Sequence, residues 1–232
     1  MSKIALGTVQ FGIDYGVSSI SGKVKPKEVG SILNYAHSQN IDLLDTASAY
    51  GNSEQVLGES NIQQFRVVTK TRYFDKAKIG IKEVALLKKD FYRSLEDLKI
   101  DNVYGVLIHN ADDLLKPGAE KLFDQLKELK QAEKIIKIGV SVYDYSQLQS
   151  ILEIFDIDLV QLPFNILDRR LIDSDMFNVL KNRGVEVHAR SVFLQGLLLM
   201  DMQNRVSKFN RWKDLWKIWH EWLNDNQITA LE

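Results

Sequence analysis

Residues 81–109 read IKEVALLKKDFYRSLEDLKIDNVYGVLIH. Apolar residues recur at helical spacing in the first part, which predicts a helix from Ile81 to Leu98. The β-branched and apolar run from Val103 to His109 predicts a buried strand shortly after that helix. Because the same alternation of strand and helix recurs in both directions along the chain, the sequence predicts a parallel sheet covered by helices.

Outward from this unit, the sequence predicts seven strands in all and four further helices. The strands are expected at Ile4–Thr8, Ile41–Asp45, Arg66–Lys70, Val103–His109, Ile136–Val142, Asp158–Leu162 and Val185–Arg190. The other helices are expected at Pro26–Asn40, Lys121–Lys130, Asp175–Arg183 and Lys208–Asn224. Gly184 is predicted to end the helix before it in the left-handed conformation that glycine adopts easily.

The predicted fold is an α/β TIM (β/α)8-type barrel. The chain has 232 residues, close to the roughly 250 residues of a typical barrel of this kind. No Pro-, Gly- or Ser-rich linker interrupts the repeated units, so residues 1–232 are expected to form a single barrel domain. No eighth strand follows Gly196, and we therefore expect a C-terminally short barrel that lacks, or does not show, the last βα unit.

The predicted end of the chain has two further implications. Thr229 and Glu232 stand at the spacing of a capping box, which predicts the start of another helix and suggests a truncated C-terminus. Without an eighth strand, the first and seventh strands are expected to expose apolar edges. A homodimer is one arrangement that would cover them.

Aromatic residues gather on one face of the predicted helix Lys208–Asn224. Phe209, Trp212, Trp216, Trp219 and Leu223 fall on a single helical stripe. Charges of both signs occupy the opposite face. This pattern favours packing of the helix on the barrel over binding of the helix to a membrane surface.

Composition excludes several classes of protein. The chain has 30 Lys and Arg against 31 Asp and Glu, a formal net charge of −1 and no cysteine. The absence of cysteine excludes disulfides, iron–sulfur clusters and thiol catalysis. The balanced charge gives no reason to expect nucleic acid, and no apolar run approaches the roughly 20 residues of a membrane helix. With no recognisable signal peptide at Met1, we expect a cytoplasmic protein whose partner is a small molecule.

Ionisable side chains stand at the ends of three consecutive predicted strands. The second strand ends in Asp45, the third in Lys70 and the fourth in His109, while Tyr50 lies in the loop after the second strand. The carboxyl ends of parallel strands meet at one mouth of a barrel, so these four side chains are expected to converge there.

The four groups suit proton transfer to a carbonyl oxygen. A tyrosine has a pKa of about 10 and needs help to exchange a proton near neutrality. We expect the Lys70 ammonium to lower the pKa of Tyr50, with Asp45 holding Lys70 charged and oriented. His109 would add a second donor to the reacting oxygen. A metal site is not expected, because the histidine stands alone at the mouth.

The sequence resembles the aldo-keto reductase family from the first strand to about Leu198. The matching stretches are Leu6-Gly7-Thr8 with Phe11-Gly12, Asp45-Thr46-Ala47 with Tyr50-Gly51, Ser53-Glu54, Leu57-Gly58, Thr69-Lys70-Thr71, Leu107-Ile108-His109, Gly139-Val140-Ser141, Gln161 with Asn165, and Gln195-Gly196-Leu197-Leu198. They occur in the order of the family along most of the chain.

This resemblance implies an NADPH-dependent oxidoreductase that reduces an aldehyde or ketone, with sugar-derived carbonyl compounds as one candidate class of substrate. It implies that Tyr50 is the general acid, that Asp45 and Lys70 tune it, and that His109 orients the carbonyl. The residues implied to bind the cofactor are Gly7, Thr8, Ser141, Gln161, Arg190 and Ser191. NADP is implied over NAD by the resemblance alone.

Two positions depart from the family pattern, and two other functions stay open. Val142 stands where the family usually has asparagine, and Arg190 where many members stack an aromatic ring on nicotinamide. The family also holds the adenosine end of the cofactor around an eighth strand. One alternative is a non-catalytic or cofactor-deficient barrel subunit. The other is an aldolase that forms a Schiff base on Lys70, which a neighbouring Asp45 disfavours because it raises the pKa of the amine.

Overall fold

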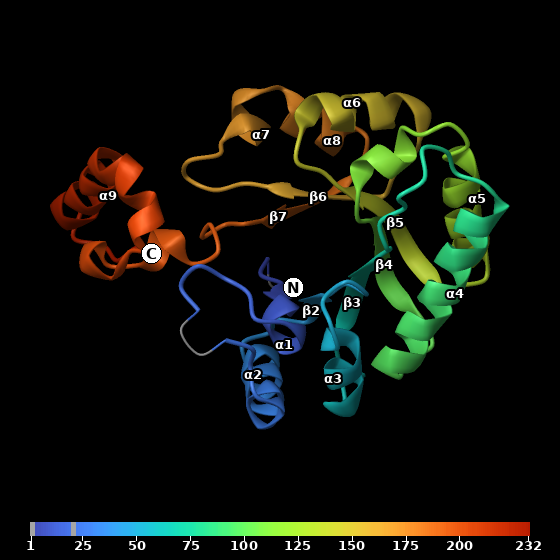
Figure 1. Cartoon of the computed structure of the whole chain (residues 1–232), viewed down its shortest axis with the longest axis horizontal. Coiled ribbons are helices and arrows are strands. Elements are labelled where there is room, and N and C mark those ends of the chain that lie inside the picture. The colour runs from blue at the N-terminus through green and yellow to red at the C-terminus, as the bar shows by residue number, and fades with distance from the viewer. Residues whose placement is uncertain (1–2, 20–21) are drawn as a thin grey trace.

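The computed structural model describes residues 3–19 and 22–232. Its seven strands are all parallel and are hydrogen-bonded to one another in the order of the chain. The strands are β1 (Leu6–Gly7), β2 (Leu43–Asp45), β3 (Arg66–Lys70), β4 (Val103–Ile108), β5 (Ile135–Ser141), β6 (Leu159–Pro163) and β7 (Glu186–Arg190). The sheet curls, and most of the helices lie on its outer side (Figure 1).

Nine α-helices occur in the part of the chain that the structure describes. They are α1 (Val9–Gly12), α2 (Pro26–Ser38), α3 (Ser53–Glu59), α4 (Ile81–Leu98), α5 (Glu120–Gln131), α6 (Tyr145–Ile154), α7 (Arg170–Asp173), α8 (Met176–Asn182) and α9 (Lys213–Asp225). Short 3-10 helices follow β4 and precede α9. None of the described helices is long and apolar enough to cross a membrane.

Apolar side chains fill both sides of the curled sheet. Leu43, Val68, Leu107 and Leu159, from four different strands, pack together as one layer. The larger core joins the remaining strand residues to the helices, with Leu122 and Leu126 of α5 among its fully buried members. Because the central strands are covered on both faces, they are near-continuous apolar runs in the sequence.

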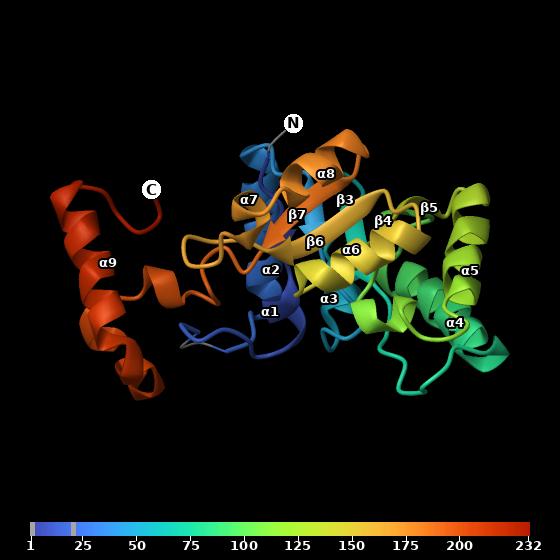
Figure 2. The ribbon, with the colours of Figure 1, turned by 90° about the horizontal axis from the view of Figure 1, so that it is seen from above.

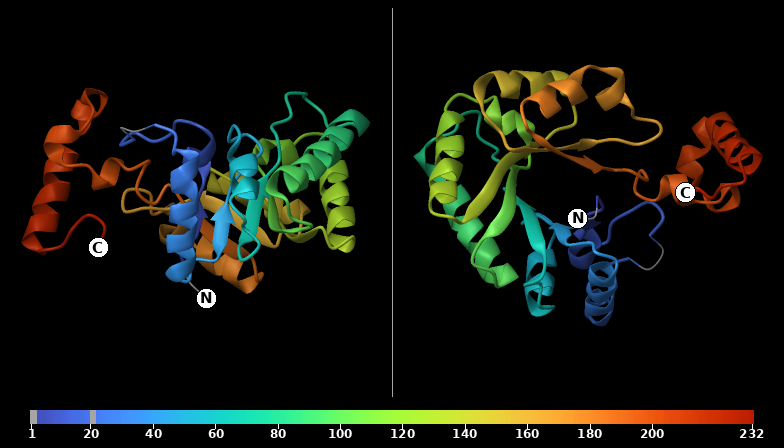
Figure 3. Two further views of the ribbon diagram at one scale, coloured as in Figure 1. Left: turned by 90° about the horizontal axis from the view of Figure 1, so that it is seen from below. Right: turned by 180° about the vertical axis from the view of Figure 1, so that it is seen from behind.

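The curled sheet is a TIM-type barrel that stops one unit short of closure in the described residues. The strand order places β1 at one edge and β7 at the other, with no pairing between them. Seen from behind, the strands form an open curve whose two ends flank the N-terminal segment (Figure 3). The predicted fold is therefore confirmed, whereas the homodimer stays a prediction.

Local signals in the sequence place several of these elements correctly. Helix α4 follows Gly80, whose backbone N–H donates to the Glu83 carboxylate at 2.9 Å, and it buries Leu87 and Phe91. Gly184 follows α8 with a φ of +69°, as predicted. The expected capping box also forms, with the Thr229 N–H donating to Glu232 Oε2 at 2.9 Å.

Helix α9 differs from the expected barrel helix. It stands apart from the other helices, beyond the open side of the sheet (Figure 2). Its Trp216 packs on Leu197 and Leu198 in the segment after β7 instead of on the strands. Trp212 of the predicted stripe is 39% exposed, so the prediction that the whole stripe packs in a core is wrong at that residue. The stripe breaks there because residues 207–212 form a 3-10 helix with a different periodicity.

Candidate active site

Four polar side chains converge at the carboxyl ends of the strands. Asp45 ends β2, Lys70 ends β3, His109 follows β4, and Gln161 lies within β6. Parallel pairing aligns these positions, since Asp45 lies beside Val68 and Lys70 lies beside Leu107 in the register of the sheet. The predicted convergence at one mouth is what this topology produces.

Lys70 and Asp45 form a buried ion pair at the centre of the mouth. Lys70 Nζ lies 2.7 Å from Asp45 Oδ1, and the two side chains are 1% and 19% exposed. The ammonium also donates to the Thr46 carbonyl at 2.9 Å. Burial lowers the pKa of Lys70, although the charge and hydrogen bond of Asp45 act to raise it. The pair is held rigidly and carries no net charge when both groups are ionised.

Gln161 joins this pair from the far side of the mouth. Its Nε2 donates to Asp45 Oδ1 at 2.7 Å, on the same oxygen that accepts from Lys70. Sequence reasoning assigned Gln161 to the cofactor and missed this bond, because 116 residues separate the two partners. One amide therefore connects β6 to the Asp45 carboxylate at the end of β2.

Tyr50 lies over the Lys70 ammonium and beside His109. Lys70 Nζ is 5.0 Å from the centre of the Tyr50 ring. The Tyr50 and His109 rings meet edge to face, with 6.0 Å between their centres. Burial, with a further contribution from the Asp45 charge, raises the pKa of Tyr50. The expected lowering by Lys70 does not occur in this structure, because Lys70 directs its ammonium to Asp45 and Thr46.

A close backbone approach fixes the loop that carries Tyr50. A Cβ added to Gly12 would lie 1.6 Å from the Tyr50 carbonyl oxygen, so only glycine fits there. Ser53 Oγ donates to the Thr8 carbonyl at 2.9 Å and pins the start of α3 to the end of β1. Thr8 is fully buried, and its own hydroxyl donates to the Asp45 carbonyl at 2.9 Å. Thr8 thus holds strands together, while its neighbour Gly7 lies exposed at the strand end.

His109 is neutral near pH 7. Burial, and secondly the charge of Lys70, lowers the pKa of His109 to about 4. Its ring stacks on Tyr73 with 4.7 Å between the centres. Nδ1 is buried and has no hydrogen-bond partner among the described residues. An imidazole in this state can donate one hydrogen bond without adding a positive charge to the mouth.

A second buried carboxyl group lies behind the site. Glu54 of α3 accepts hydrogen bonds from Thr69 Oγ1 at 2.5 Å and from Ser94 Oγ at 2.9 Å. Burial raises the pKa of Glu54, whereas these two hydrogen bonds and the charge of Lys70 act to lower it. The sequence showed Glu54 only within the resemblance and gave it no role. Its spacing of four residues from Tyr50, in the first turn of α3, is the signal that marks it.

The wall beyond the catalytic groups is formed by β5, β6 and β7. Ser141 and Gln161 lie opposite each other in the register of the sheet, and each is 4% exposed. Arg190 follows on β7, beside Pro163 of β6. A carboxamide needs one donor and one acceptor, and the Ser141 hydroxyl with the Gln161 amide oxygen fit that need. The residues present therefore fit the nicotinamide end of a dinucleotide.

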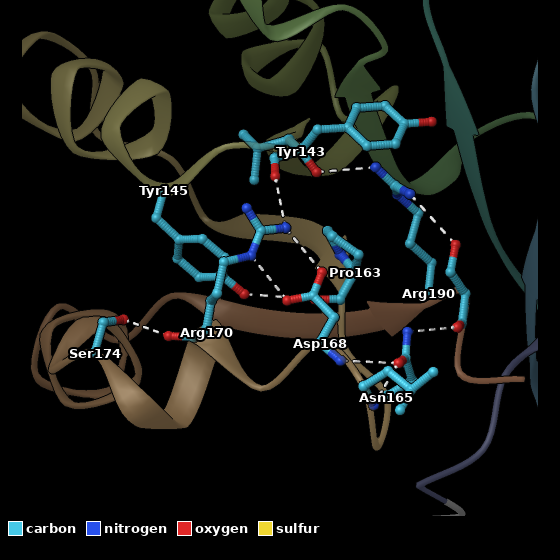
Figure 4. A network of polar contacts seen from close by, with 11 residues as sticks. Tyr143, Tyr145, Pro163, Asn165, Asp168, Arg170, Ser174 and Arg190 are labelled. Atoms are coloured by element: carbon cyan, nitrogen blue, oxygen red, sulfur yellow. Dashed lines mark hydrogen bonds and ion pairs between the residues drawn. The ribbon is translucent and has the colours of Figure 1, made fainter. Parts of the chain in front are cut away.

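Arg190 lies across the top of this wall. Its guanidinium carbon is 3.8 Å from the centre of the Tyr143 ring, and Nη2 donates to the Val142 carbonyl at 2.9 Å (Figure 4). Ser191 has a φ of +56° and accepts a long bond of 3.5 Å from Arg190 Nη1. Val142 thus takes part through its backbone, and its buried side chain offers no polar group.

His188 lies away from the mouth. Its Nε2 lies 2.7 Å from Glu186 Oε1, at the amino end of β7. Glu186 also accepts hydrogen bonds from Lys137 and from the Tyr104 hydroxyl. This polar cluster closes the opposite end of the barrel, because Glu186 begins its strand whereas Arg190 ends it.

One known protein family covers nearly the whole chain. The Aldo/keto reductase family pattern matches residues 3–231. The chain belongs to the aldo/keto reductase family. The parallel strands in the order of the chain thus form the fold of a member of this family.

Two known proteins illustrate the similarity in sequence. The NADH-specific methylglyoxal reductase of Escherichia coli strain K12 is 26% identical over 220 residues, covering 85% of this chain and 65% of that protein. Aldo-keto reductase YhdN of Bacillus subtilis strain 168 is 28% identical over 190 residues, covering 75% and 53%. The chain thus spans between about half and two thirds of these relatives.

A solved structure shows the same fold. The aldo/keto reductase from Klebsiella pneumoniae in complex with NADP and acetate superposes with a TM-score of 0.68 at 20% identity. The superposition covers 97% of this chain and 73% of that chain. At this level of identity, the similarity establishes the barrel fold alone. It does not identify the substrate or the cofactor of this chain.

Proposed function

We propose that the protein reduces a small aldehyde or ketone with a hydride from NADPH, and that Tyr50 is the general acid. The observation that carries the proposal is the convergence of Tyr50 and His109 above the buried Lys70–Asp45 pair. Membership of the aldo/keto reductase family supports the reaction type. A sugar-derived carbonyl compound fits within this proposal as one substrate class.

Tyr50 holds the proton that the carbonyl oxygen receives. Because burial raises its pKa, the phenol stays protonated at neutral pH until negative charge develops on the substrate oxygen. The phenolate that remains attracts the Lys70 ammonium more strongly than the neutral phenol does, and Asp45 holds that ammonium in place at 2.7 Å beside the ring. His109, neutral at this pH, donates a second hydrogen bond to the same oxygen. When bound, the reduced nicotinamide supplies the hydride.

The wall of β5, β6 and β7 would hold the nicotinamide end of the cofactor. We assign the carboxamide to Ser141 and Gln161, with Arg190 and Ser191 beside the ring and Gly7 at the facing strand end. NADPH is our expected cofactor. The E. coli relative is named as specific for NADH, and the Klebsiella structure holds NADP, so both cofactors occur among similar proteins.

The test is the oxidation of NADPH, and separately of NADH, by the 232-residue chain with methylglyoxal as a simple carbonyl substrate. Loss of the absorbance of the reduced cofactor is expected, and Tyr50→Phe should abolish it without unfolding the protein. Tyr35→Phe is the matched control, because Tyr35 lies exposed on α2 away from the mouth. Turnover by Tyr50→Phe at the wild-type rate would overturn the assignment of the acid.

Two outcomes would favour the alternatives. If cofactor binds but no carbonyl compound is reduced, the chain acts as a non-catalytic subunit. If borohydride traps a carbonyl substrate covalently on Lys70, the chain is an aldolase. Burial lowers the pKa of Lys70, which would help such a nucleophile, yet its ammonium is engaged by Asp45 and Thr46 and is 1% exposed. The geometry therefore favours reduction.

A further inference from the structure

The charges at the mouth do not cancel. Lys70 and Asp45 neutralise each other, and His109 is uncharged near pH 7. Arg190 has no carboxylate oxygen within 4 Å among the described residues, whereas the neighbouring Arg170 is paired with Asp168 at 2.8 Å (Figure 4). One uncompensated positive charge therefore remains above the strand ends.

Arg190 is fixed where its charge acts on the mouth. Stacking on Tyr143 and the bond to the Val142 carbonyl hold the guanidinium across the end of β6. Its charge acts to lower the pKa of Tyr50, against the larger effects of burial and Asp45. It also acts to lower the pKa of His109, in the same direction as burial and Lys70. A ligand that occupies the mouth therefore experiences this charge.

We propose that Arg190 makes the site discriminate between the two oxidation states of the nicotinamide cofactor, binding the reduced form more tightly than the oxidised form. The inference rests on the proposed function. The dihydronicotinamide ring is neutral and the oxidised ring carries one positive charge, whereas the two forms share every phosphate, ribose and carboxamide group. A fixed cation beside the ring repels only the oxidised form.

The expected preference is about tenfold. Two unit charges roughly 6 Å apart in a partly solvated site, with an effective dielectric constant of about 40, repel each other enough to change a dissociation constant by about that factor. Weaker binding of the oxidised form would speed its release after each turnover. Arg190 would thus act as a determinant of cofactor state, separate from the proton transfer by Tyr50.

The same guanidinium has other chemical uses, and these predict different behaviour. If Arg190 held a cofactor phosphate, its loss would weaken both oxidation states by the same factor. If it held a substrate carboxylate, its loss would change neither cofactor affinity. Only repulsion from the ring changes the ratio of the two affinities.

The experiment measures dissociation constants of the 232-residue chain for NADPH and NADP+, and for NADH and NAD+, by calorimetry without a carbonyl substrate. Arg190→Met and Arg190→Gln remove the charge, Arg190→Lys retains it, and Arg170→Met is the matched control. Circular dichroism confirms that each variant is folded, and two neutral variants are used so that misfolding of one does not decide the result.

The proposal expects wild type, Arg190→Lys and Arg170→Met to prefer the reduced form by about tenfold, and the neutral variants to bring the ratio close to one. A ratio that is unchanged in the neutral variants, or already one in wild type, overturns the inference and leaves the proposed function standing. If neither oxidation state of either cofactor binds to wild type, the proposed function itself fails, and the inference fails with it.

Discussion

The buried pair of Lys70 and Asp45 should respond asymmetrically to the loss of one partner. Lys70 is 1% exposed, and without Asp45 its ammonium would keep only the Thr46 carbonyl as an acceptor. Asp45 is 19% exposed, and without Lys70 it would still accept from Gln161 and reach water. Leaving a charge buried without its partner costs about 3–5 kcal/mol of unfolding free energy, and a better solvated group costs less.

We therefore expect Asp45→Asn to lower the unfolding free energy by about 3–5 kcal/mol at neutral pH. Lys70→Met should lower it by about 1–2 kcal/mol. Urea unfolding followed by circular dichroism measures both values. The double variant should lower the unfolding free energy by less than the sum of the two single variants. Each single variant leaves one charged group unpaired, whereas the double variant leaves neither.

The pH dependence gives the same reasoning a second test. Burial lowers the pKa of Lys70, and Asp45 is the group that opposes this effect. In Asp45→Asn the pKa of Lys70 in the folded state falls further below its value in the unfolded state. At pH values between these two pKa values the unfolded state binds more protons, so the unfolding free energy rises with pH. The deficit of Asp45→Asn should thus shrink as the pH rises toward the unfolded pKa of lysine, about 10.4. Equal costs for the two single variants, or a deficit that does not change with pH, would refute the reasoning.

Three other perturbations test other parts of the molecule. Gly12→Ala should destabilise the fold by about 1–3 kcal/mol and reduce turnover, because its Cβ would lie 1.6 Å from the Tyr50 carbonyl oxygen. Thermal unfolding measures the loss of stability, and the NADPH assay measures the loss of turnover. Burial alone would raise the pKa of Glu186, but its hydrogen bonds lower it to about 2, so its stabilisation is present above pH 4.5 and is lost as pH falls toward 2. Glu186→Gln should therefore cost about 1–2 kcal/mol near neutrality and little at the acid end, and a constant deficit in acid titration would contradict this. Trp216→Ala should make α9 susceptible to proteolysis while α4 stays protected, because Trp216 packs in a small cluster apart from the main core. Equal protection of both helices in the variant would contradict this.

Much of the fold follows from periodicity alone. The predicted strand Arg66–Lys70 and helix Ile81–Leu98 are confirmed residue for residue, because each has one uninterrupted pattern between clear ends. The sequence patterns do not predict helices α1, α3, α6 and α7, of which α1 and α7 have only four residues each. Helix α3 has only seven residues and contains Gly58, so its pattern is too short to separate from a loop. Helix α6 begins with the cap of Asp144 on the Ser146 N–H, a signal that is weak without its tertiary contacts.

The location of the site was predictable, but its electrostatics were not. Parallel strands place Asp45, Lys70 and His109 at one end whatever the details of packing. The raised pKa of Tyr50 depends on how deeply the phenol is buried, and no local pattern in the sequence encodes that depth.

The bond between Gln161 and Asp45 joins two strands that are not neighbours, since β3, β4 and β5 lie between β2 and β6. A hydrogen bond of this kind cannot form while only the first half of the chain is ordered. During refolding, or as the chain leaves the ribosome, the complete site should therefore form late, after most of the secondary structure. The order in which the strands are made thus determines when the Gln161 amide can first hold the Asp45 carboxylate in place.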